Sequence, residues 1–468
     1  MNRLSTSTIP SLFVLCAIIA ISEPSNCQTA AEMHSQRSRS LINKKEVNAA
    51  LDEAELAVAL DSTNGRYAYD LGDIYLYHTD KRTLALRAFE KALENGFVTP
   101  IVFHRKAMCL FHLSRHHEAI VQLHESIERN FKALEVSSNP EGIKRDIADS
   151  YDWLTKQYEA LADWENFYQA AKNVGKYDPK NQWYLSLMDE GLQMMGYTEL
   201  SNKNYDKASE YLREALDYKL RINPKDIAQR YMRHMAEIAQ KRKRLGEVTP
   251  DFIHKAVIVY IHEVDITLNV KGKATKIHKR ITDGDKKHTL MISKAFREVI
   301  ETFSDGHLSV SVDTITMHKP LTNANIIEIN AEGIPIFRYQ TVEMMRDIYK
   351  AAGDKFDTFI YVLPTHWGEA HGGGHFISIP NSTQRALKGV IEIAPRFSLA
   401  IWNHEFFHVI EAITGIKPVH GHYKTNKHLF PEWKGEADDE MSFHQYHYNA
   451  TLPKFGWKNL KFVDRKNR

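Results

Sequence analysis

Hydrophobic and polar positions follow two different patterns along this chain. From about residue 48 to residue 244 the chain is rich in Ala, Leu, Glu and Lys and has no strict alternation, which predicts α-helices. After Pro250 come short apolar runs rich in β-branched residues, which predict strands at 256–261, 307–312, 326–329, 359–363 and 376–379. Amphipathic helices are expected over 292–303 and 342–352. The pattern predicts an all-α first half followed by an α/β or α+β domain.

A motif recurs inside the helical half. Its copies, 34 residues apart in the first two cases, are Ala85, Phe89 and Ala92, then Ala119, Leu123 and Ser126, then Ala208, Leu212 and Ala215. Small residues precede the copies at Gly72, Ala107 and Gly196. This pattern resembles the tetratricopeptide repeat, in which small residues let two antiparallel helices approach closely. The resemblance implies a tetratricopeptide-like solenoid that binds a protein partner or peptide. A helical array that only buries its own faces is the alternative.

The start of the chain has the features of an export signal. Arg3 precedes an apolar run over 12–21, which is too short to span a bilayer of about 30 Å. We therefore expect a signal peptide over 1–27 and a secreted or periplasmic protein. Lipid anchoring at Cys27 is disfavoured because Pro24-Ser25-Asn26 before it is a poor lipobox. Cleavage would leave Cys109 as the one cysteine, so no intrachain disulfide is expected.

Composition narrows the class of protein further. The 468 residues exceed one typical domain, and we expect a helical repeat domain over 40–248 and a second domain over 250–468. The 61 Lys and Arg residues against 59 Asp and Glu residues leave a net charge of +2, which argues against a nucleic-acid binder. The mean hydropathy of −0.43 excludes a polytopic membrane protein, and no membrane span is expected in the mature chain.

The strongest chemical signal is an H-E-x-x-H pentad set in an apolar, proline-free stretch, His404-Glu405-Phe406-Phe407-His408. On a helix, His404 and His408 project from one face and can bind one Zn²⁺, while Glu405 can take a proton from the metal-bound water. A metzincin would carry Gly and His where this chain has Glu411 and Thr414, so that class is excluded.

Residues 432–443 resemble the second helix of gluzincins, the class of thermolysin-like and aminopeptidase N-like zinc enzymes. The resemblance extends over 357–447. It implies that Glu436 is the third zinc ligand and that Glu440, or Asp439 beside it, orients His404. The alternatives for the third ligand are His420, His422, Glu432 and Glu440.

Two further features belong to the same resemblance. Gluzincins place an edge strand before the pentad, which would assign substrate binding to Gly373, Gly374, His375 and Phe376. A tight turn at the glycines is the alternative. These enzymes also use a His or Tyr to stabilise the oxyanion, and the candidates are His444, Tyr446 and His447.

The sequence thus predicts a zincin-like metallopeptidase domain behind the repeats. A peptide or protein substrate would be cleaved by a zinc-activated water, with Glu405 as general base. One alternative is a non-catalytic repeat-based binding protein with a degenerate zincin scaffold. The other is a zinc hydrolase that acts on a different amide bond.

Overall fold

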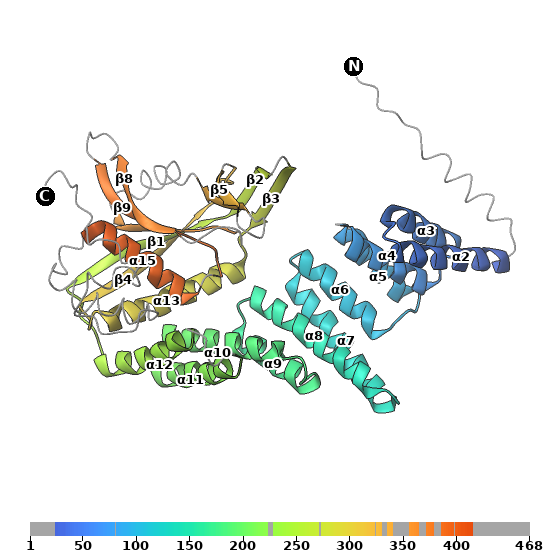
Figure 1. Ribbon diagram of the computed structural model, residues 1–468, viewed down its shortest axis with the longest axis horizontal. Helices are drawn as coiled ribbons and strands as arrows, with labels where there is room; N and C mark the ends of the chain where they lie inside the picture. Colours follow the sequence, from blue (N-terminus) through green and yellow to red (C-terminus); the bar gives the residue numbers. More distant parts are fainter. Residues whose placement is uncertain are drawn as a thin grey trace, which may run out of the picture. The chain divides into compact units, whose positions relative to one another are not determined.

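The computed structural model describes residues 24–79, 81–222, 228–270, 273–322, 324–329, 335–339, 355–364, 371–378, 385–396 and 398–414 (Figure 1). The chain divides into two compact units, each described by itself. The first unit comprises Met1–Ala160 and Gln169–Tyr184, and the second comprises Leu161–Tyr168 and Leu185–Arg468. No helix among the described residues is both long enough and apolar enough to cross a bilayer.

The first unit is built from antiparallel pairs of helices (Figure 1). Its helices are α2 (Pro24–Asn43), α3 (Val47–Leu60), α4 (Gly65–His78), α5 (Arg82–Glu94), α6 (Pro100–His112), α7 (His116–Val136) and α8 (Pro140–Ala160). The division between the units falls within α9 (Trp164–Tyr177). Most of the predicted signal peptide, residues 1–23, lies outside the described residues, and residues 24–27 belong to α2.

The residues of the predicted repeat motif form the contacts between paired helices. The three copies of the motif are buried throughout, with Phe89, Leu123 and Leu212 all 0% exposed. A Cβ atom on Gly72 would lie 2.7 Å from the Phe89 ring, and one on Gly196 would lie 2.6 Å from Leu212. The small residues therefore permit the close approach of two helices that the sequence predicted. Cys109 lies in the same core, where burial raises the pKa of its thiol to about 12.

Four of the described turns between consecutive helices have the same backbone geometry. The second residue after α2, α6, α8 and α10 (Trp183–Ser201) has a left-handed conformation, at Lys45, Ser114, Ala162 and Lys203. At Ser114, the next amide, that of Arg115, donates to the carbonyl of Leu110 over 2.8 Å. This bond is the Schellman closure, which uses carbonyls that the end of a helix leaves unpaired. The turn makes α2–α3 a pair of the same kind, although its sequence does not carry the motif.

The second unit joins the last helices of the array to a mixed β-sheet. After α10 come α11 (Tyr205–Ile222) and α12 (Ala228–Leu245). The strands in sheet order are β4 (Leu308–Met317), β1 (Phe252–Ile261), β7 (Thr358–Val362), β9 (Arg385–Ile393) and β8 (His371–Ser378). The first four strands are parallel, and β8 is antiparallel to β9. Two hairpins accompany the sheet, β2 (Glu263–Val270) with β3 (Lys273–Arg280) and β5 (Ala324–Ile329) with β6 (Pro335–Tyr339).

The two faces of the sheet are covered differently. On one face, Val257 and Val259 of β1 pack with Ile266 and Ile277 of the β2–β3 hairpin. On the other face lie two helices, α13 (Asp283–Phe303) and α15 (Leu399–Thr414) (Figure 1). A capping box starts α13, in which Thr282 and Asp285 accept each other's backbone amides over 3.0 and 2.9 Å.

The predicted strands are present, whereas four other described strands, β2, β3, β6 and β9, and with them both hairpins, were not expected from the sequence. All five predicted stretches lie largely within strands, and the helix predicted over 292–303 is the second half of α13. The helix predicted over 342–352 falls outside the described residues. The glycines at 372–374 pair with β9 inside β8, so the tight-turn alternative is wrong. The second half is thus α/β in its described part.

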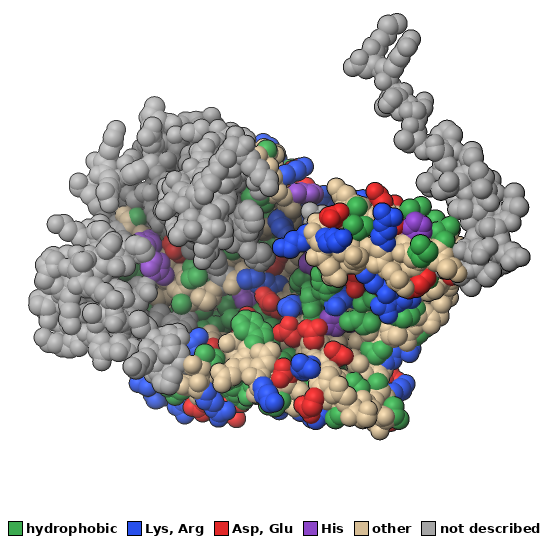
Figure 2. Space-filling view, turned by 45° about the vertical axis from the view of Figure 1, so that its right-hand side comes forward, with side chains coloured by type: hydrophobic (Ala, Val, Ile, Leu, Met, Phe, Trp, Pro, Cys, Tyr) green, Lys and Arg blue, Asp and Glu red, His purple; other side chains and the backbone are tan. Residues whose placement is uncertain are grey.

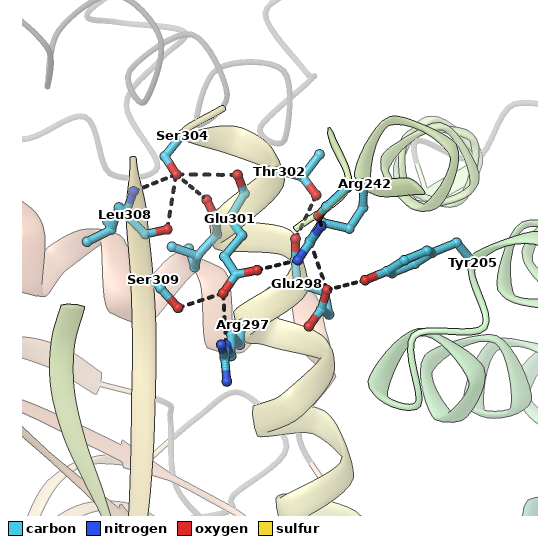
Figure 3. Close-up of polar contacts among 11 residues, drawn as sticks. Tyr205, Arg242, Arg297, Glu298, Glu301, Thr302, Ser304, Leu308 and Ser309 are labelled. Carbon is cyan, nitrogen blue, oxygen red and sulfur yellow. Dashed lines mark hydrogen bonds and ion pairs between the residues drawn. The ribbon is translucent and has the colours of Figure 1, made fainter. Parts of the chain in front are cut away.

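A buried ionic network joins α12 to α13 (Figure 3). The Arg242 guanidinium lies 2.8 Å from Glu298 and donates to Glu301 over 2.6 Å, and all three side chains are at most 4% exposed. Tyr205 donates to Glu298 and Ser309 donates to Glu301. Burial alone would raise the pKa of Glu301, but the hydrogen bond from Ser309 and the nearby arginines outweigh it and leave the pKa below its ordinary value. Glu301 is therefore charged, and both buried carboxylates are paired with Arg242.

Candidate functional site

The H-E-x-x-H pentad lies on α15, as its apolar flanks predict. One side of this helix is buried, with Trp402, Phe406 and Val409 at most 2% exposed. The Phe406 ring lies 5.2 Å from Phe296 of α13 and 5.1 Å from His254 of β1. These contacts hold α15 against α13 and the sheet.

The two histidines of the pentad lie side by side on the half-open side of α15. The ring centroids of His404 and His408 are 5.1 Å apart and their planes make an angle of 83°. Zinc lies about 2.0–2.1 Å from each imidazole nitrogen that binds it, so rings this close can share one ion. Glu405 between them is 5% exposed. The two imidazoles could therefore supply two ligands of a zinc ion, and the buried Glu405 lies between them in the sequence.

The other predicted members of this centre are not described. Glu436, Asp439, Glu440, His444, Tyr446 and His447 lie outside the described residues, as do the alternative ligands His420, His422 and Glu432. Within the described part of the chain, no group of three His, Cys, Asp or Glu side chains could hold a metal. The third ligand thus stays a prediction from the resemblance.

The strand predicted to receive substrate lies next to α15. Strand β8, which contains Gly373, Gly374, His375 and Phe376, is the last strand in the described sheet order. It packs against α15 and pairs with β9, where Gly374 lies opposite Gly389. A Cβ atom on Gly389 would lie 2.6 Å from Val409 of α15. Gly389 therefore permits the close approach of the pentad helix to the sheet.

Sequence reasoning missed the polar residues beneath the pentad helix. His254 is fully buried on β1, and its Nε2 lies 2.7 Å from Thr358 Oγ1 of β7. Asn403 of α15 is also 0% exposed. No motif surrounds His254, and its position in an alternating strand pattern is the one signal that could have indicated burial.

The helical repeats have a second candidate site, on a face formed by α4, α6 and α8. Contacts between α4 and α6 and between α6 and α8 place these helices on a common face. Arg105 of α6 stacks on the Tyr77 ring at 5.0 Å and lies 3.5 Å from Asp73 of α4. The Tyr77 hydroxyl donates to Met108 Sδ over 3.4 Å, yet Tyr77 is still 49% exposed. This face combines an exposed aromatic ring with a fixed cation.

Elsewhere Figure 2 shows side chains of both charges interspersed over the visible surface, consistent with the net charge of +2.

Comparisons with known proteins concern the helical half. The tetratricopeptide repeat family matches residues 190–221, so the chain contains a repeat of this kind, as predicted. A comparison with curated proteins finds no match. These findings support the repeat-based binding alternative better than the metallopeptidase interpretation.

Solved structures match the chain with low similarity, and two of the three described here are titled tetratricopeptide repeat proteins. One is the MamA protein, with 14% identity and a TM-score of 0.33 over 42% of this chain and 96% of that one. Another is YrrB, titled a tetratricopeptide repeat protein with an unusual peptide-binding site, with 19% identity and a TM-score of 0.31 over 44% of this chain and 90% of that one. A tetratricopeptide repeat protein from Parabacteroides merdae has 16% identity and a TM-score of 0.32, over 46% and 76% of the two chains.

Proposed function

We propose that this chain is a protein-binding repeat protein that captures a peptide segment on the face formed by α4, α6 and α8. This proposal rests on the exposed Tyr77 ring of α4, on which Arg105 of α6 stacks. Tyr and Arg dominate the binding energy of protein interfaces because they bury large surfaces and carry directional polar groups. Repeat solenoids bind partners along such extended faces.

A selection experiment tests this proposal. The mature chain is used to select binders from a phage-displayed library of random peptides, and affinity is measured for the selected peptide. The double variant Tyr77→Ala with Arg105→Ala should weaken binding by about tenfold or more, which corresponds to about 1.4 kcal/mol. The control is Val121→Ala, since Val121 is 62% exposed on the second helix α7. Unchanged affinity in the double variant, or equal loss in the control, would refute the proposed face.

The second candidate function is zinc-dependent hydrolysis of a peptide bond, favoured by the paired imidazoles of His404 and His408 on α15. These histidines would hold the ion together with Glu436, the ligand implied by the gluzincin resemblance. Zinc, when bound, would lower the pKa of a coordinated water to about 7. Glu405 would accept the proton of that water and pass it to the leaving amine. Strand β8 would align an extended substrate through its backbone groups. In a second form of this proposal, the same residues hydrolyse an amide bond other than a peptide bond.

Metal analysis combined with a peptide-library digest tests the second function. The chain should bind about one zinc ion per molecule, as three-ligand catalytic sites do. Glu405→Gln should keep the zinc and lose hydrolysis, whereas His408→Ala and Glu436→Ala should lose both. His117→Ala is the control, because His117 is an exposed histidine of α7. Full hydrolysis by Glu405→Gln would exclude the mechanism, and zinc retention by Glu436→Ala would exclude Glu436 as a ligand.

A further inference from the structure

The described sheet of the second unit ends at β4 on one side. In the sheet order β4 is the first strand, and β1 is its one neighbour among the described strands. The first three residues of β4, 308–310, are buried, whereas the seven residues over 311–317 are exposed or half-buried. Residues 311–317 therefore form an open edge, which neither proposed function uses.

Alternate residues of the open edge direct their backbone groups away from the sheet. The amide of His262, which follows β1, donates to the carbonyl of Met317 over 3.0 Å. Because parallel pairing uses every second residue of a strand, the odd-numbered residues of β4 face β1. Val312, Thr314 and Thr316 therefore direct their N–H and C=O groups outward, where no strand of the described sheet pairs with them.

The composition of the open edge does not protect it from pairing. Natural edge strands are protected by lysine, proline, a bulge or a short length. Residues 311–317 contain neither lysine nor proline, and β4 pairs with β1 over ten residues without a bulge. The one charged side chain, that of Asp313, lies 3.4 Å from the Lys355 ammonium group, which compensates its charge. An exposed edge of this kind favours the addition of another strand.

The open edge is complementary to a second copy of itself. In a two-fold antiparallel pairing centred on Thr314, this residue lies opposite its own copy, and Val312 lies opposite Thr316. The outward N–H and C=O groups of all three residues then have hydrogen-bond partners. The pairing also places two threonine side chains opposite each other, and such pairs stabilise antiparallel sheets.

Charge and apolar contacts favour this register. A pairing centred on Asp313 would place two carboxylates directly opposite each other, which is destabilising. A pairing centred on Thr314 places Asp313 opposite Ile315 instead. Ile315 and Met317 are half-buried and pack beside the apolar cluster between β1 and the β2–β3 hairpin. An added strand would bury more of both side chains, which is favourable.

We propose that two copies of this chain associate through β4, in an antiparallel pairing whose two-fold axis passes Thr314. The two sheets then become continuous. Association stops at two chains, because each copy has then used its open edge. The contact lies in the second unit and uses backbone groups of β4, so it depends neither on the Tyr77 face nor on the zinc hypothesis.

Sedimentation equilibrium with the full-length chain tests the proposal. The average mass should rise with concentration from 54.0 kDa towards twice that value. Thr314→Pro should keep the chain at the lower mass, because proline removes the outward amide at the centre of the pairing and is tolerated at sheet edges. Thr314→Ala is the matched control, since it keeps that amide and should still associate.

Cysteine cross-linking tests the register. In the proposed pairing the Cα atoms of the two copies of residue 314 are about 5.5 Å apart, which a disulfide can span. The two copies of residue 316 are about 14 Å apart along the strands, which is too far. Under mild oxidation Thr314→Cys should form a covalent dimer, and Thr316→Cys should form no more of it than the natural chain. Both variants contain the same three natural cysteines.

Three results would overturn the proposal. They are the mass of a single chain at every concentration, equal association of Thr314→Pro and Thr314→Ala, and equal cross-linking of the two cysteine variants. The first result comes from the unaltered chain, so it does not depend on the folding of any variant, and it would leave the open edge to a strand of a different protein. Tyr77→Ala with Arg105→Ala should leave the association unchanged, which separates β4 from the face formed by α4, α6 and α8.

Discussion

At the scale of single residues, His254 couples the fold of the sheet to pH. Complete burial lowers the pKa of His254 to about 4, against an ordinary value of 6.5. The unfolded chain therefore takes up a proton before the folded chain does. The stability contributed by neutral His254 is complete above pH 6.5 and is lost as the pH falls towards 4. By linkage, about 2 kcal/mol of the free energy of unfolding of the second unit should be lost by pH 5.

Urea denaturation at pH 7.5, 6 and 5 measures this effect, with His254→Gln as the comparison. Glutamine cannot titrate in this range but can still form a hydrogen bond with Thr358, which lies 2.7 Å from the histidine. The variant should lose about 2 kcal/mol less than the natural chain between pH 7.5 and pH 5. Parallel pH profiles for the two proteins would show that His254 is not responsible.

Glycines show how far a single residue can be interpreted from sequence. Gly72 and Gly196 were predicted to allow close helix approach because they stand 13 and 12 residues before copies of a recurring motif. Gly389 has the equivalent role between β9 and α15. Its neighbour across the contact, Val409, is 20 residues away in the sequence, so no local pattern indicated it. Gly72 and Gly196 were recognisable because the motif that follows them recurs. No recurring motif accompanies Gly389.

At the scale of elements, the turns within helix pairs carry backbone strain. Ser114 adopts a φ of 58°, a conformation that costs residues with a Cβ atom about 1 kcal/mol relative to glycine. Ser114→Gly should therefore raise the free energy of unfolding of the first unit by a few tenths to about 1 kcal/mol, after the greater freedom of glycine in the unfolded chain is subtracted.

The matched control for this prediction is Ser137→Gly. Ser137 also follows a helix, α7, but its φ of −84° suits any residue. Glycine there relieves no strain and should lower stability. Thermal unfolding followed by circular dichroism measures both variants, and a Ser114→Gly variant less stable than the natural chain would contradict the prediction.

Some strands of the second half were predicted from the sequence and others were missed. The buried strands β1 and β7 were recognisable because runs of β-branched and aromatic residues stand between turn residues. The β2–β3 hairpin was missed although the apolar residues of β2 alternate strictly with polar ones, from Val264 to Val270, a pattern that predicts a strand. In β3 the apolar residues Ala274 and Ile277 do not alternate.

At the scale of the whole molecule, Arg242 joins segments far apart in the sequence. It is the partner of Glu298 and Glu301, which lie 56 and 59 residues later. Removing one partner of a buried ionic network leaves uncompensated charge, which costs about 3–5 kcal/mol. Arg242→Met should lower the free energy of unfolding of the second unit by about this amount and leave the first unit unchanged.

Hydrogen exchange, measured peptide by peptide, reports the protection of each unit separately. Protection should fall in α13 and α15 and stay the same in α4 to α7 of the Arg242→Met variant. Lys243→Met is the control, because the ion pair of Lys243 with Asp206 is exposed and contributes little. Equal loss of protection in both units, or in the control, would show that the network does not act within the second unit alone.

Three features could be predicted from the amino-acid sequence: the helical repeats, the change to an α/β second half, and the position of His404 and His408 on one helix. These features depend on periodicity and on fixed spacing, which are local properties of a chain. Only the tertiary structure shows the antiparallel position of β8 beside α15 and the burial of His254 against Phe406. Each of these joins segments that only folding brings together, and long-range contacts leave no period in the sequence from which they could be predicted.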